Sequence, residues 1–168
     1  MNRQTVNSGE PRVVALGGGT GLSNLLRGLK RHTSRITAIV TVADDGGSSG
    51  RLRRQMGVLP PGDIRNCLVA LADDDTLISS LFQYRFDEGE MSGHSLGNLM
   101  LAALAKMTGD FGEAVRRCGE LLGIRGAVVP ATLEQVSLQA DLADGSRISG
   151  QASIAGSARF CRRVWLQP

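Results

Sequence analysis

Five residues near the start of the chain, Gly17-Gly18-Gly19-Thr20-Gly21, have the composition of a phosphate-binding turn. Glycines let a ligand approach the backbone closely, and N–H groups at the start of a following helix can then donate to an anion. The spacing differs from the G-x-G-x-x-G dinucleotide fingerprint, because Leu22 stands at the third glycine position. No lysine of a Walker A loop follows. A turn that only reverses the chain is the alternative interpretation.

A second group of polar residues follows an apolar segment, Ile36–Ala43. Asp44 and Asp45 come at its end, and adjacent carboxylates can hold Mg²⁺ through one or two oxygens, with water and phosphate completing the shell. The hydroxyls of Ser48 and Ser49 and the guanidinium of Arg51 could bind phosphate. The alternative is an Asx turn at the start of a solvated loop.

Two later motifs add ligand candidates. In PPGDIRN, Asp63 precedes a helical pattern and Asn66 lies within it, so Asp63 is either a helix cap or a ligand. In SGHSLGN, His94 either contacts a ligand or only begins a helix, and Ser95 is placed to cap that helix. Asn98 lies one turn into an apolar helix, where its amide needs a polar partner.

The elements around these motifs predict an α/β fold. A strand over 13–16, a helix over 23–31 and a strand over 36–43 give a βαβ unit, and ligands bind at the carboxyl edge of such sheets. Residues 44–62 are expected to form a long functional loop. Further helices are predicted from Asp63, over 77–85 with Thr76 as its cap, from Ser95, and over 110–122 with Asp110 as its cap. In the third of these, the predicted buried stripe comprises Leu96, Leu99, Met100, Ala103, Leu104 and Met107, extended by Leu101 and Ala102.

The last third of the chain changes period. Apolar residues alternate with polar ones over 136–142, Asp144-Gly145 is a hairpin turn signal, and the alternation returns over 148–154. A final strand is expected over 160–166. The fold class is therefore predicted as a Rossmann-like three-layer α/β fold with a parallel sheet, plus an antiparallel β-hairpin excursion near the C-terminus. An open parallel sheet needs more strands than residues 1–59 supply, so the chain is expected to be the N-terminal portion of a longer domain.

Composition narrows the class of protein. The 168 residues are 42% hydrophobic and 21% charged, with a formal net charge of +3, which is typical of a globular domain and does not indicate nucleic-acid binding. No apolar run reaches the ~18 residues of a membrane span. Residues 1–11 are polar and predicted to form a disordered tail, with the domain over 12–168. The three cysteines lack metal or disulfide spacing, and a cytoplasmic location is expected.

Four stretches in order carry a resemblance: GGGTGLSNLLRGLK, VADDGGSSGRLR, GVLPPGDIRNCL and FDEGEMSGHSLGNLMLAAL. Together they resemble the gluconeogenesis factor family (YvcK-like), a branch of the 2-phospho-L-lactate transferase (CofD-like) superfamily, from about Val13 to Pro168. The resemblance implies a Rossmann-like fold and a cytoplasmic bacterial protein. It also implies a role in gluconeogenic growth, cell shape and envelope synthesis, and binding of UDP-sugars such as UDP-N-acetylglucosamine. A homo-oligomer and envelope-synthesis proteins are the expected protein partners.

The resemblance also implies residue roles. Gly17–Gly21 would lie at the nucleotide phosphate and Asp44 and Asp45 at a metal or acceptor, while Asp63, His94, Ser95 and Asn98 would line the same cleft. The transferase branch moves a phospholactyl group from a guanosine diphosphate donor to a deazaflavin alcohol with Mg²⁺, so such an enzyme is the alternative to a regulator without turnover. An NAD(P)-dependent enzyme is a third hypothesis, which the broken glycine spacing weakens.

Overall fold

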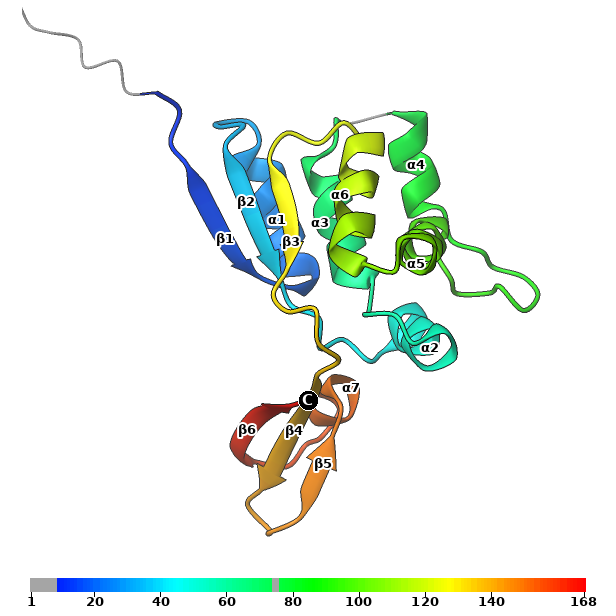
Figure 1. Cartoon of the computed structure of the whole chain (residues 1–168). Helices are drawn as coiled ribbons and strands as arrows, with labels where there is room; N and C mark the ends of the chain where they lie inside the picture. Colours follow the sequence, from blue (N-terminus) through cyan, green and yellow to red (C-terminus); the bar gives the residue numbers. More distant parts are fainter. Residues whose placement is uncertain (1–8, 74–75) are drawn as a thin grey trace, which may run out of the picture.

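A three-stranded parallel sheet organises the first unit of the fold. The computed structural model describes residues 9–73 and 76–168, and its sheet has the order β1 (Val13–Gly17), β2 (Ile36–Val40) and β3 (Ala127–Pro130) (Figure 1). The predicted βαβ unit and the α/β class are confirmed. The third strand was missed, because its four-residue run AVVP reveals itself only by pairing with β2, far away in the sequence.

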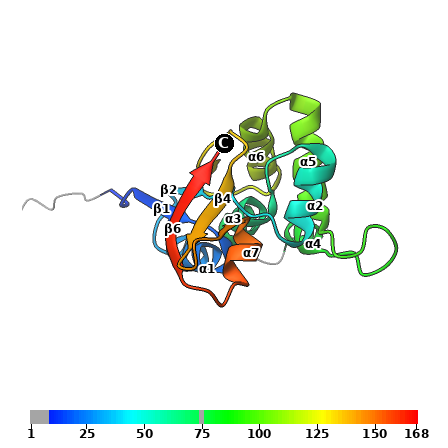
Figure 2. The ribbon, with the colours of Figure 1, turned by 90° about the horizontal axis from the view of Figure 1, so that it is seen from below.

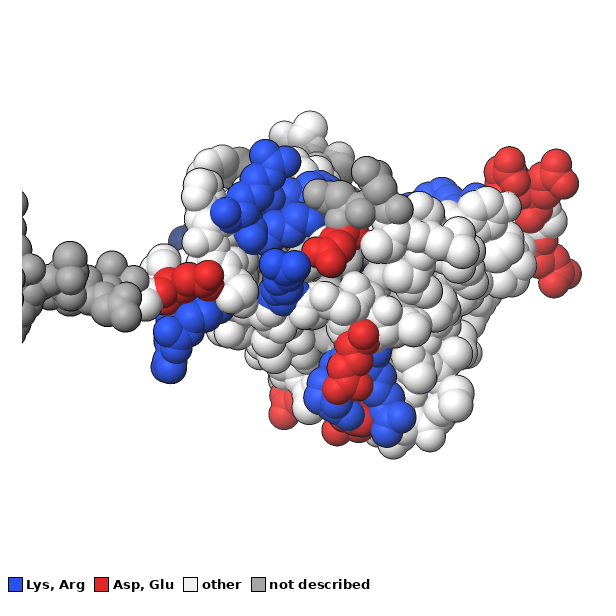
Figure 3. Space-filling view, turned by 90° about the horizontal axis from the view of Figure 1, so that it is seen from above, with Lys and Arg blue, Asp and Glu red and all other residues white. Residues whose placement is uncertain are grey.

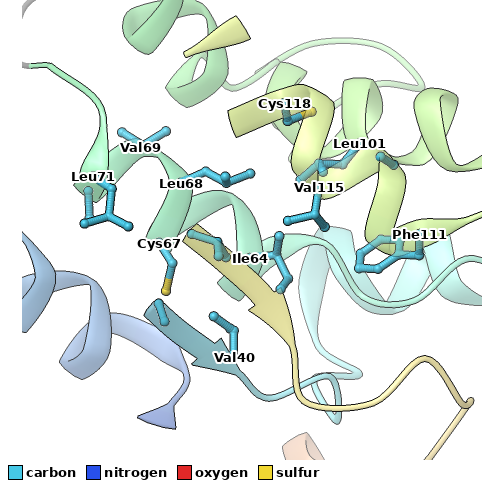
Figure 4. Close-up of a cluster of buried hydrophobic side chains, with 14 of the residues drawn as sticks. Val40, Ile64, Cys67, Leu68, Val69, Leu71, Leu101, Phe111, Val115 and Cys118 are labelled. Atoms are coloured by element: carbon cyan, nitrogen blue, oxygen red, sulfur yellow. The ribbon is translucent and has the colours of Figure 1, made fainter. Parts of the chain in front are cut away.

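Helices cover one face of this sheet. They are α1 (Gly19–Leu29), α3 (Gly62–Leu71) and α6 (Phe111–Leu121), and their apolar sides meet the buried strand residues Ala38, Val40 and Val128. Figure 4 shows side chains from β2, α3 and α6 gathered in this core. Alternate strand residues point the other way, because the side-chain period of a strand is two.

The opposite face of the sheet is open in the part of the chain that the structure describes. Val14 is 58% exposed, Leu16 72% and Val129 38%, although parallel sheets are ordinarily buried on both faces. The described helices therefore build a layer on one side of the sheet only.

Two more helices pack outside the first layer, α4 (Leu77–Gln83) and α5 (Leu96–Thr108). The predicted caps are confirmed at Thr76, Ser95 and Asp110, each of which accepts a hydrogen bond from the backbone N–H three residues later. The predicted stripe on α5 is right in part: Leu101 and Ala102 are buried, whereas Met107 is 80% exposed and Leu96, Leu99, Met100 and Leu104 are only partly buried. Close packing explains the difference, since the small residues turn inward. The buried residues are Gly97, Asn98, Leu101, Ala102 and Ala105.

The predicted loop over 44–62 contains a ten-residue helix, α2 (Gly47–Met56). Gly46 begins it in an extended conformation, and Gly57 ends it with a left-handed φ of +64°, which glycine adopts without strain. Only Leu52 and Met56 are apolar in this helix, so the sequence has no helical hydrophobic period there. The prediction of a structureless loop was wrong for this reason.

An antiparallel sheet follows at the carboxyl edge of the parallel strands (Figure 2). Its strands β4 (Ser137–Leu142), β5 (Arg147–Ser149) and β6 (Cys161–Gln167) have the order β5-β4-β6, and the Asp144-Gly145 turn is confirmed. The strand predicted over 148–154 ends early. Gly150 has a φ of +97°, and the short helix α7 (Gln151–Ala155) begins after it.

Charges of both signs lie at the amino ends of the parallel strands (Figure 3). Lysine and arginine side chains gather there beside acidic ones, and a separate acidic group projects at the right of the view. The loop between α4 and α5 contains three exposed acidic residues, Asp87, Glu88 and Glu90. Within residues 9–73 and 76–168, no helix combines the length and apolar character needed to cross a bilayer.

Candidate functional site

The glycine turn joins β1 directly to α1. Gly17 ends the strand, Gly18 is the extended N-cap residue, and Gly19 begins the helix with a φ of +61°. A Cβ on Gly18 would overlap the Thr41 hydroxyl and lie 2.7 Å from Oδ2 of Asp63, so only glycine fits there. No side chain caps α1, and Thr20 and Gly21 are exposed. The first turn of the helix therefore presents backbone N–H groups at the carboxyl edge of the sheet.

Asp63 lies in the first turn of α3 and faces this turn. Its predicted role as cap of its own helix is wrong, because Pro61 is the N-cap residue and no side chain caps α3. Instead, the carboxylate accepts a hydrogen bond from the Gly19 N–H. Burial raises the pKa of Asp63, and the negative charge of Asp44 raises it further, although the Gly19 hydrogen bond opposes both. Asp63 therefore holds a proton more tightly than an ordinary aspartate.

The two adjacent aspartates after β2 have different partners. Asp44 Oδ1 accepts the Gly46 N–H at 3.0 Å, and its Oδ2 points toward the start of α3, 3.4 Å from where a Cβ on Gly62 would lie. Asp45 Oδ1 accepts the Ala152 N–H at 2.8 Å, at the start of α7. The structure therefore brings Asp44 toward Asp63 and separates it from Asp45. Among the described residues, no group of three or more His, Cys, Asp or Glu side chains could hold a metal ion by itself.

The two serines of α2 connect this region to other helices. Ser49 Oγ accepts the Gly62 N–H at 3.1 Å and so joins the starts of α2 and α3. Ser48 Oγ lies 3.0 Å from Nδ1 of His94 and accepts a hydrogen bond from Asn98 Nδ2 at 3.0 Å. Burial lowers the pKa of His94, and the positive charges of Arg51 and Arg85 lower it further, so the neutral imidazole is favoured. His94, Ser95 and Asn98 are buried.

Two predicted ligand residues are engaged with protein groups. Arg51 Nη2 donates to the Ser92 carbonyl at 2.7 Å, and Asn66 Oδ1 accepts from Arg65 Nη2 at 2.6 Å. Three buried side-chain polar atoms, Arg51 Nε, Arg65 Nε and Asn98 Oδ1, have no hydrogen-bond partner among the described residues. The predicted site residues therefore form two neighbouring groups, an open one around Gly19, Asp44 and Asp63 and a buried one around Ser48, His94 and Asn98.

Three residues of this region were not predicted. Thr41 follows β2, and its hydroxyl lies where a Cβ on Gly18 would be. Gly62 donates to Ser49, and Arg65 is a buried guanidinium whose pKa is lowered by desolvation. Thr41 carries a signal that could have revealed it, because it is a hydroxyl residue at the carboxyl end of a strand. Arg65 carries none, since its burial depends on the packing of α4.

An apolar hollow lies beside the open group. Its volume is about 370 Å³, and it lies between the carboxyl ends of β2 and β3 and the second sheet, lined by Thr41, Val42, Ala43, Ala131, Thr132, Val136, Leu138, Gln151 and Leu166. The edge of the sheet thus combines helix N–H donors, a carboxylate pair and an adjacent apolar cavity. This combination can receive a molecule with an anionic end and a less polar end.

Comparisons with known proteins agree with this fold. Residues 13–168 match the family described as 2-phospho-L-lactate transferase CofD. A Nostoc relative is 62% identical over 145 residues, 86% of this chain and 32% of its own length. The protein named gluconeogenesis factor in Bacillus subtilis is 52% identical over 160 residues, 95% of this chain and 50% of its own length.

Solved structures extend the similarity to three dimensions. A crystal structure of a Bacillus halodurans protein superposes with a TM-score of 0.88 at 50% sequence identity, covering 94% of this chain and 51% of that one. The chain thus spans a third to a half of the length of the relatives it matches. Because the family match covers all but the first twelve residues, the chain belongs to the 2-phospho-L-lactate transferase CofD family.

Proposed function

We propose that this chain supplies the phosphate-binding part of a nucleotide-sugar site in a regulatory protein of gluconeogenic growth, with cell shape and envelope synthesis as the processes it serves. The ligand class is a nucleoside diphosphate sugar of the UDP-N-acetylglucosamine type. The name gluconeogenesis factor, given to relatives in Bacillus subtilis and Halalkalibacterium halodurans at 52% and 51% identity, supports the physiological part of this proposal.

The convergence of Gly19, Asp44 and Asp63 at one sheet edge carries the biochemical part. The start of α1 has no cap from its own N-cap residue, and it offers N–H groups and the positive end of the helix dipole to a diphosphate, with the Gly19 N–H shared with Asp63. The apolar hollow beside Thr41 would receive the less polar end of the ligand. Ligands of open α/β sheets bind outside the carboxyl ends of the strands, which is where these features lie.

A divalent cation would bind between the two carboxylates and the diphosphate. Asp44 and Asp63 face one another closely enough for the charge of Asp44 to raise the pKa of Asp63. Mg²⁺ binds through one or two carboxylates plus phosphate oxygens and waters, so two carboxylates suffice when a diphosphate is present. The cation would neutralise both the carboxylate pair and the ligand.

Calorimetry with UDP-N-acetylglucosamine tests the proposal. We expect saturable heat in Mg²⁺ for the unmodified chain and for Asp45→Asn, whose carboxylate contacts α7. Asp44→Asn should weaken binding about 10- to 100-fold, the usual effect of altering a metal shell. Heat no greater than dilution, or equal binding by Asp44→Asn, would contradict it.

A Mg²⁺-dependent phospholactyl-type transferase is the second candidate, favoured by the description of the matched family. Transfer from a diphosphate donor requires neutralisation of the charge that develops on the leaving group, which a cation at Asp44 and Asp63 would supply. A product assay with a guanosine diphosphate donor and a deazaflavin alcohol tests it. Formation of a phospholactyl product that Asp44→Asn abolishes would favour the enzyme over the regulator.

A further inference from the structure

One face of the antiparallel sheet carries cationic and aromatic side chains. Opposite partners in the register are Asp141 with Arg147, Asp141 with Arg163, and Gln139 with Trp165. Since partners across a ladder and residues two apart along a strand share a face, Arg147, Arg163 and Trp165 project from the same side. The sheet that carries them lies at the lower end of the molecule in Figure 1, away from the glycine turn between β1 and α1.

Trp165 orients two of these arginines. The guanidinium carbon of Arg147 lies 4.8 Å from the centroid of the Trp165 ring, and that of Arg163 lies 5.4 Å from it. A guanidinium stacked on an aromatic ring keeps its N–H groups available at its edge. The guanidinium groups of Arg147 and Arg163 are therefore held in place before any ligand binds, which lowers the entropic cost of binding.

An irregularity in the sheet adds a third arginine. Asp141 pairs with Arg163 and Leu142 with Cys161, so Arg162 is an extra residue in β6 without a partner across the ladder. Such bulges redirect side chains. Arg147, Arg162 and Arg163 consequently line one hollow of about 650 Å³ with Asp141, Leu142 and Gly145.

The charge of this hollow is positive. Asp141 Oδ1 accepts from Arg147 Nε at 2.8 Å and balances one of the three arginines. Asp144 in the neighbouring turn is paired with Arg159. Within the described residues, no ion pair involves Arg162 or Arg163.

We propose that Arg147, Arg162 and Arg163 form a binding site for a small phosphate anion, separate from the glycine turn. A phosphate dianion matches the two unbalanced positive charges, and its three terminal oxygens can accept hydrogen bonds from three guanidinium groups. A single carboxylate would leave one arginine unmatched. The proposal does not depend on the nucleotide-sugar site.

Trp165 makes the test direct, because it is the only tryptophan in the chain. Its fluorescence is followed while inorganic phosphate is added at constant ionic strength. We expect a saturable change, weakened about tenfold by Arg162→Gln, since hydrogen bonds to charged groups are worth roughly that factor. Arg162 is not stacked on the indole, so its loss should leave the initial spectrum unchanged. The matched control is Arg116→Gln, an exposed arginine on α6 paired with Glu113, which should bind as the unmodified chain does.

Three results would overturn the proposal. The first is a fluorescence change that chloride reproduces at equal ionic strength. The second is a saturable change that Arg162→Gln leaves intact, or that Asp44→Asn removes, since the signal would then come from the glycine turn. The third is binding to phosphatidic acid vesicles with which inorganic phosphate does not compete, because the ligand would then be a membrane surface.

Discussion

Ser48 Oγ lies 3.0 Å from Nδ1 of His94, and this contact joins the start of α2 to the residue before the cap of α5. Asn98 Nδ2 donates to the same oxygen, so the serine proton is free to point toward the imidazole. The arrangement suits a neutral histidine whose Nδ1 accepts a hydrogen bond from the Ser48 hydroxyl. Burial and two nearby arginines lower the pKa of His94 and favour the same form.

Acidification should therefore destabilise the chain through His94. The folded-state pKa lies below the ordinary value of 6.5, so the unfolded chain binds the proton more readily. The free energy of unfolding should be unaffected by this group above that pH and fall as the pH drops below it. Urea denaturation at about pH 7.5 and about pH 5.5 measures the difference. His94→Gln should reduce the pH dependence and cost about 1–3 kcal/mol at the higher pH, since Ser48 loses a buried partner; His32→Gln, at an exposed position, is the control.

Replacing Asp63 should affect ligand binding in opposite directions with and without a cation. In Mg²⁺, Asp63→Asn removes a proposed ligand and should weaken UDP-N-acetylglucosamine binding about 10-fold or more. With EDTA, the same variant should bind more tightly than the unmodified chain, because a buried carboxylate no longer repels the phosphates. Calorimetry under both conditions measures this. Weaker binding under both conditions would argue that Asp63 only positions the turn.

Two glycines of the same turn should respond differently to alanine. A Cβ on Gly18 would overlap the Thr41 hydroxyl, so Gly18→Ala should lower the free energy of unfolding by about 1–3 kcal/mol. Gly21 has nothing within 4 Å of its Cβ position and lies in α1, so Gly21→Ala should keep or raise stability by up to about 1 kcal/mol. Urea denaturation of both variants measures the two free energies of unfolding. An equal decrease in both variants would contradict the packing described for Gly18 and Gly21.

Neighbouring residues of β1 should differ because they point to opposite faces. Ala15 is 7% exposed and Leu16 is 72% exposed. Ala15→Glu should cost about 3 kcal/mol or more, because a carboxylate enters the core. Leu16→Glu should change the free energy of unfolding by about 0.5 kcal/mol or less and reduce self-association. Urea denaturation measures the two free energies of unfolding, and analytical ultracentrifugation measures self-association. Strong destabilisation by Leu16→Glu would show that this face of the sheet is covered.

Local signals predicted the elements well. The caps at Thr76, Ser95 and Asp110 depend on a side chain and a backbone N–H three residues away, so they can be recognised in the sequence. The hairpin at Asp144-Gly145 is local in the same sense. By contrast, β3 and α2 are stabilised by contacts with residues outside their own segments, so no local pattern reveals them. Strand β3 pairs with β2, and Ser49 of α2 accepts the N–H of Gly62.

The sequence indicated which segments lie together at the sheet edge, but not how their side chains are arranged. Glycine and aspartate motifs at strand ends indicated one edge, because the carboxyl ends of parallel strands lie together. The separation of Asp44 from Asp45 could not be foreseen, since it depends on the Ala152 N–H, 107 residues later. The contact of Asp63 with Gly19 was hidden for the same reason: Asp63 looked like a cap of its own helix, while its partner begins another.

That contact means that the glycine turn already carries an anion of its own. The Gly19 N–H, which a phosphate at the start of α1 would use, is bonded to the Asp63 carboxylate. A phosphate at the proposed site would therefore bind by exchange: it would compete with the built-in carboxylate for one N–H donor, and its affinity would be lowered by the free energy of the hydrogen bond that it replaces. Because the pKa of Asp63 is raised, mild acid would neutralise this competitor before most other carboxylates.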